Sequence, residues 1–223
     1  RDQGDGLVGS EMCIRDRIRP FRRGREVPLP GVPGGGRAVL AEAALDCDLL
    51  VNLPRVKAHV QTRLTLAVKN CFGCLIGLRK AWWHMAHGTG TRFFDRLVRI
   101  PPVLPASLTL VDGITAMHRT GPINGDPYAL SLLAAATEPA AADRALHEVL
   151  GVAPDQSPLM AACQRAGLAG ADLAGLRFPL AGPEEVRVND FLVPDVLNPV
   201  RFNPLHFLTS SLRRLLMQYR AAL

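Results

Sequence analysis

Short apolar runs alternate with helical segments along this chain, and this alternation limits the fold more than any other feature. The runs cover residues 48–54, 107–113 and 130–136. Apolar runs of this length, bounded by proline, glycine or acidic residues, are typical of buried strands rather than helices. Strands that alternate with helices predict an α/β fold, with a layered, mostly parallel sheet and flanking helices.

Helices are expected between and after these strands. Apolar spacing and boundary residues predict helices over 38–45, 62–75, 139–150 and 158–166. Proline suits the first turn of a helix, where its missing N–H costs nothing, and glycine follows the last two of these segments. Residues 205–223 predict an amphipathic, Arg-bearing helix that docks on the domain or on a second subunit in preference to a membrane.

The chain is expected to form one domain over residues 18–200, followed by the C-terminal amphipathic segment 201–223. A length of 223 residues suits one sizeable core. Residues 1–17 are polar or aperiodic and resemble a translated sequencing-adapter fragment. We therefore expect this segment to be non-native and the natural N-terminal part of the protein to be missing.

Composition excludes several classes of protein. The formal net charge is +6, but the basic residues are not interleaved with aromatic ones, so nucleic acid is not an expected partner. The five cysteines follow no disulfide framework, which favours a reducing compartment. No apolar run is long enough for a membrane span, and no signal peptide is visible. A soluble, cytoplasmic protein is the expectation.

The polar residues that could carry chemistry gather between residues 52 and 84. This window holds every lysine of the chain, Lys57, Lys69 and Lys80, together with His59 and His84. A lysine ammonium is a compact charge that can lose its proton when buried, which suits anion binding and proton transfer. The window also follows a strand end, where α/β sheets bind ligands. Solvated lysines on a loop and a helix would give the same pattern.

Metal and nucleotide sites are not expected. Cys71 and Cys74 form one CxxC pair, and no further cysteines stand at the spacing of a cluster or zinc site, so the pair is either a redox dithiol or a packing feature. His59 and His84 lack the spaced acid of known metal motifs, which leaves metal-dependent chemistry as the weaker alternative. The loop 121–125 lacks the glycine spacing of nucleotide-binding loops.

Several ordered motifs resemble those of the domain of unknown function 362 family. They are Asn52-Leu-Pro54 with Lys57 and His59, Lys69-Asn-Cys-Phe-Gly73, His84, Asp112-Gly113, Gly121-Pro122 with Gly125, and Glu138-Pro-Ala-Ala-Ala-Asp143. The resemblance covers roughly residues 46–182. It implies a link to iron–sulfur redox metabolism, because members of the family often carry or accompany a ferredoxin-type cluster domain. This chain holds no such module, so a cluster is expected on a missing segment or on a separate ferredoxin.

The motifs define a set of expected site residues. The catalytic candidates are Lys57, His59, Lys69 and His84, and the substrate-binding candidates are Asn52, Thr62, Asn70, Asp112 and Asp143. We expect the lysines to hold an anionic group, a histidine to move a proton, and Asp112 to orient a partner or bind a cation. The first hypothesis is an enzyme that acts on an anionic small molecule. The second is a non-catalytic protein that docks a ferredoxin or forms a homodimer.

Overall fold

One long strand organises the sheet of this protein. The computed structural model describes residues 21–32, 34–87, 90–121 and 124–198. Strand β6 (Ser107–His118) pairs in parallel with β3 (Leu50–Asn52) and β4 (Arg55–His59). The strands β5 (Arg63–Thr65), β7 (Asp126–Tyr128) and β8 (Leu132–Ala136) complete the sheet: β5 pairs antiparallel with β4, and the other two pair antiparallel with β6.

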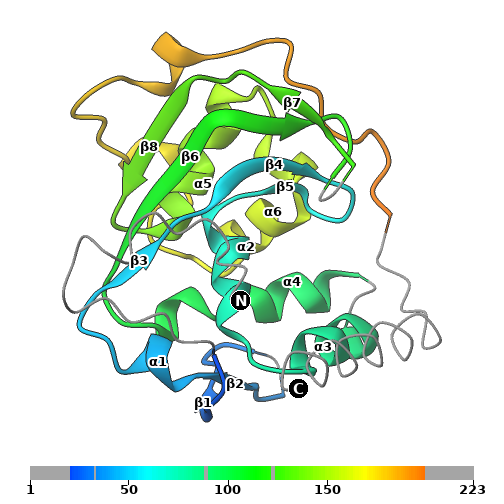
Figure 1. The fold of residues 1–223 in the computed structure, drawn as a ribbon, viewed down its shortest axis with the longest axis vertical. Coiled ribbons are helices and arrows are strands. Elements are labelled where there is room, and N and C mark those ends of the chain that lie inside the picture. The colour runs from blue at the N-terminus through cyan, green and yellow to red at the C-terminus, as the bar shows by residue number, and fades with distance from the viewer. Residues whose placement is uncertain (1–20, 33, 88–89, 122–123, 199–223) are drawn as a thin grey trace, which may run out of the picture.

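Two helices lie behind this sheet in Figure 1, one packed against the sheet and the other packed against the first helix. They are α5 (Pro139–Val149) and α6 (Pro158–Arg165), and both begin with proline as expected. Both also end before a glycine with positive φ, Gly151 and Gly167. A core of buried residues from β4, β5, β6 and α5 fills the space between helix and sheet, including Val56, Leu64 and Leu146. The predicted α/β class, a layered sheet with flanking helices, is confirmed.

A second layer of structure lies at one end of the sheet, in the lower part of Figure 1. It contains the hairpin β1 (Gly24–Pro28) and β2 (Arg37–Ala41) and the helices α1 (Glu42–Leu45), α2 (Ala67–Cys71), α3 (Arg79–His87) and α4 (Thr91–Leu97). Short 3-10 helices lie at Phe72–Cys74, Pro101–Val103, Pro154–Gln156, Leu173–Gly175 and Pro183–Val186. A separate core fills this layer and includes the fully buried Phe93, Leu40 and Leu97.

Two of the predicted helices are wrong in part. Residues 38–41 belong to β2, and only α1 is helical in the expected segment 38–45. In the segment 62–75, Arg63 has a positive φ of 64°, which reverses the chain so that β5 returns along β4. The helix therefore begins at Ala67 rather than near Thr62, and α3 and α4 were not predicted.

Other sequence predictions fall outside the described residues. They are the non-native origin of the segment 1–17 and the helix over 205–223. The division into domains also stays a prediction. Within the part of the chain that is described, no helix combines the length and the apolar character needed to cross a membrane.

Candidate functional site

The carboxyl end of β4 carries the first two residues of the site. Val56 and Ala58 are fully buried in the core beneath the sheet, so the alternating residues Lys57 and His59 point to its other side. The backbone N–H of Gln61 donates to Nδ1 of His59 at 3.0 Å. This bond leaves the proton of the neutral imidazole on Nε2, which makes Nε2 a hydrogen-bond donor.

Lys69 enters the same region from α2. Burial lowers the pKa of Lys69 to about 8, and the Nζ atom lies 5.8 Å from the centre of the Phe72 ring. Neither Lys69 nor Lys57 forms an ion pair with any acid among the described residues. A desolvated ammonium without a carboxylate partner is costly, and an anion bound beside it would offset that cost.

His84 is placed by the aromatic residues beneath α3. Its ring stacks on Phe93 at 4.6 Å between centroids, and it forms an edge-to-face contact with Phe72 at 5.6 Å between centroids. Burial and then the charge of Lys69 lower the pKa of His84 to about 4. The Nδ1 atom is buried and has no hydrogen-bond partner among the described residues.

These residues are close enough for their charges to act on one another. Burial lowers the pKa of His59 to about 3, and the charges of Lys69, His84 and Lys57 lower it further. We call Lys57, His59, Lys69 and His84 the basic cluster. At neutral pH both imidazoles are uncharged, while Lys69 is protonated in most molecules. The cluster can therefore donate hydrogen bonds, attract an anion and exchange protons.

Thr65 is a further polar residue of this region that was not among the expected site residues. It lies opposite Lys57 in the pairing of β4 with β5, and its Oγ1 atom is buried without a partner among the described residues. Since cross-strand partners share a face of the sheet, the hydroxyl is oriented to the same side as Lys57. Its position could not be predicted because the apolar residues of 62–75 have helical spacing, which predicted a helix where β5 lies.

Asn52 and Asn70 join α2 to the sheet. The Nδ2 atom of Asn52 donates to the carbonyl of Ala67 at 3.1 Å and lies 3.4 Å from Oγ1 of Thr109, while Oδ1 accepts from Nδ2 of Asn70 at 2.8 Å. Both polar atoms of the Asn52 amide are thus engaged within the protein. The pair fixes the position of the helix that carries Lys69.

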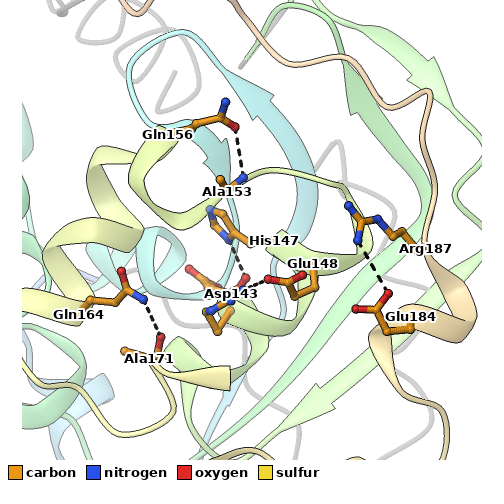
Figure 2. A network of polar contacts seen from close by, with 10 residues as sticks. Asp143, His147, Glu148, Ala153, Gln156, Gln164, Ala171, Glu184 and Arg187 are labelled. Carbon is orange, nitrogen blue, oxygen red and sulfur yellow. Dashed lines mark hydrogen bonds and ion pairs between the residues drawn. The ribbon is translucent and has the colours of Figure 1, made fainter. Parts of the chain in front are cut away.

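Asp143 supports the same helix from below. It is buried on α5, and its carboxylate accepts from the backbone N–H of Ala67 at 2.7 Å and of Val68 at 3.2 Å. Burial raises the pKa of Asp143 to about 7, although both of these bonds act in the opposite direction. Figure 2 shows Asp143 one helical turn from His147, whose Nδ1 lies 2.7 Å from the Asp143 carbonyl. Asp143 thus caps the first turn of α2.

Thr62 and Asp112 are engaged elsewhere. The hydroxyl of Thr62 donates to the carbonyl of Leu64 at 2.7 Å and so stabilises the turn between β4 and β5. The carboxylate of Asp112 pairs with Nε of Arg55 at 2.9 Å, and hydrogen bonds from Arg55 and from the N–H of Ile114 lower its pKa. Neither residue takes part in the basic cluster. Their polar groups instead bind other groups of the protein.

The cysteines and histidines do not form a metal centre among the described residues. No group of three or more histidine, cysteine or acidic side chains there has a suitable arrangement. Cys71 and Cys74 are buried free thiols in the second core, and burial raises the pKa of both. Lys80 lies beside Cys74, and burial lowers its pKa. Protonated, buried thiols are poor nucleophiles, which favours packing over redox chemistry.

The fold and the site define an α/β protein with a half-buried basic cluster at the carboxyl end of a parallel strand. The model of the domain of unknown function 362 family matches residues 11–148. The chain is also 35% identical over 210 residues to the thylakoid-associated protein sll1697 of Synechocystis sp.. This alignment covers 90% of the chain and 65% of the relative, and no solved structure matches the chain. The protein belongs to the domain of unknown function 362 family.

Proposed function

We propose that this protein binds an anionic small molecule, a carboxylate or a phosphate, at the basic cluster and acts on it by proton transfer. The observation that carries this proposal is Lys69, a desolvated ammonium with no carboxylate partner among the described residues. Thr65 Oγ1 and His84 Nδ1 add buried polar atoms that also lack partners there. A bound anion would give these groups hydrogen-bond and ion-pair partners.

The residues of the basic cluster would have different chemical roles. Lys57 and Lys69 hold the negative charge, and His59 donates from Nε2. The free Nδ1 of His84 supports its role as the proton acceptor, because the low pKa of this ring keeps it neutral at physiological pH. Lys69, with a pKa of about 8, is an alternative proton donor near neutral pH.

The proposed metabolic role of the protein rests on its membership of the family. We propose a link to iron–sulfur redox metabolism through a separate ferredoxin or a cluster on a further segment, since the described cysteines offer no cluster site. The relative is named for its association with thylakoids, which favours a membrane surface as the place of action over the predicted cytoplasmic location. A non-catalytic protein that docks a ferredoxin is the alternative.

Replacement of Lys69 by glutamine tests the binding proposal. Lys69→Gln keeps a long polar side chain but removes the charge, so we expect phosphate or a dicarboxylate to bind about 10- to 100-fold more weakly, as for the loss of one charged hydrogen bond. Isothermal titration calorimetry with inorganic phosphate, malonate and succinate measures this change. The matched control is Lys80→Gln, which removes a half-buried lysine outside the cluster.

The control variant should bind each probe with the affinity of the unmodified protein. Equal losses in the two variants would mean that net charge alone attracts the anion. Unchanged binding in Lys69→Gln, with a normal unfolding transition, would contradict the assignment of the site.

A further inference from the structure

One face of the sheet exposes a continuous set of large apolar side chains. They lie on β6, on its neighbours β3 and β8, or directly after β3, and five of them are between 42% and 70% exposed: Val51, Leu53, Leu110, Ile114 and Leu133. The register places Val51 opposite Leu108 and Leu133 opposite Asp112, so these side chains project to the same side. We call these five residues the open face.

The opposite face of the same strands is fully covered. Thr109 and Val111 are at most 1% exposed, and the strands pack there against α5. Figure 1 shows α5 and α6 on that side, while none of the described helices covers the open face. Grouped, exposed apolar side chains of this size mark an interaction surface.

The charges on the open face limit its occupant. Arg55 and Asp112 lie on the same side of the sheet and form an ion pair with each other at 2.9 Å. This pair balances the two charges beside the apolar residues of β6 and β8, while Lys57, which has no ion pair among the described residues, lies further along β4 on the same side. The five apolar side chains therefore suit an apolar layer, such as one side of an amphipathic helix.

A segment of this same chain has the matching pattern. Residues 205–223 place leucines at positions 205, 208, 212, 215 and 216, the spacing of one apolar helix face. As a helix this segment would be about 28 Å long. An amphipathic helix is stable only when its apolar side is buried, and the open face offers apolar side chains that could bury it.

The route of the chain allows this contact. The described chain ends at Asn198, whose N–H donates to the carbonyl of Val60 at 2.7 Å. Val60 directly follows β4, the strand that lies beside β6 and carries Arg55. The residues 199–204 can span about 20 Å. We propose that residues 205–223 dock as a helix on the open face and form the missing layer of the sheet.

Hydrogen–deuterium exchange on the full chain tests this docking. We expect backbone amides of residues 205–223 to exchange at least about tenfold more slowly than an unprotected peptide. Leu133→Asp places a charge in the open face and should remove that protection. Leu78→Asp is the matched control, because Leu78 is 66% exposed and lies before α3, away from the sheet.

Two results would overturn the proposal. The first is free exchange of residues 205–223 in the unmodified chain. The second is a dimer that Leu133→Asp dissociates and that survives deletion of residues 201–223, because a second copy would then cover the open face. Light scattering coupled to size-exclusion chromatography measures the mass in each case.

Discussion

Asp143→Ala is expected to lower the free energy of unfolding by about 3 kcal/mol, because it leaves two buried backbone donors without an acceptor. The carboxylate of Asp143 accepts from the N–H of Ala67 and of Val68, in the first turn of α2. No residue within α2 can accept these bonds, since the first N–H groups of a helix have no intrahelical partner. Chemical denaturation followed by circular dichroism measures the change.

Asp143→Asn separates the loss of the acceptor from the loss of the charge. An asparagine retains one acceptor oxygen, so it should cost less than alanine. The sign of its pH dependence follows from the raised pKa of about 7. The stability that Asp143 contributes is complete below the ordinary aspartate pKa and is lost as pH rises through about 7. The asparagine variant should therefore approach the unmodified protein as pH rises from 5 to about 8.

An exposed acid provides the control for this experiment. Asp155→Ala removes a carboxylate in the segment before α6, and its effect should stay within about 0.5 kcal/mol. A similarly small effect of Asp143→Ala would contradict the capping role of this residue. Because α2 also carries Lys69, we expect the alanine variant to bind anions more weakly as well.

Gly121→Ala is expected to have an effect of similar size, about 3 kcal/mol, through steric overlap next to the site. A Cβ atom at Gly121 would lie 2.0 Å from the carbonyl oxygen of Ala58, and the Gly121 carbonyl also accepts from the N–H of Val60. The overlap would push β4 away at the residue before His59. The variant should thus lose both stability and anion affinity, as measured by thermal unfolding and calorimetry.

A glycine in open space is the matched control. A Cβ atom at Gly175 would meet no described atom within 4 Å, so Gly175→Ala should leave stability and binding nearly unchanged. If Gly121→Ala binds phosphate normally, β4 and the loop that begins at Gly121 do not need this close contact to form the site.

Three strands could be predicted because short apolar runs with turn residues at their ends are typical of buried strands. The runs at 48–54, 107–113 and 130–136 contain β3, the first half of β6, and β8. The helices α5 and α6 were equally readable, since proline and glycine mark their ends. These signals are local, and each depends on the side chains of the segment itself.

The segment 62–75 could not be read in this way. Its apolar residues Leu64, Val68 and Phe72 follow a helical period and are all buried, but they lie in a strand, a helix and a 3-10 turn. The chain reverses at Arg63, whose positive φ is not signalled by its residue type. The pairing of β5 with β4 decides the structure there, and it depends on residues outside the segment.

The proximity of the site residues was only partly visible in the sequence. Clustering in the window 52–84 indicated Lys57, His59, Lys69 and His84, and the structure brings these four residues together. The supporting roles of Asn52 and Asp143 depend on contacts between distant segments, such as α5 with α2. The periodic spacing of apolar residues carries no information about such contacts.

The pKa of Lys69 is the measurement that tests the central claim most directly. NMR of the full chain, observing the Lys69 Cε and Nζ signals across pH, should give a pKa near 8 in the free protein. Added phosphate or malonate should raise the pKa of Lys69, because a bound anion stabilises the charged ammonium. Anion affinity should correspondingly fall as pH rises through about 8. An ordinary lysine pKa that neither anion changes would contradict the proposal that the basic cluster is an anion site.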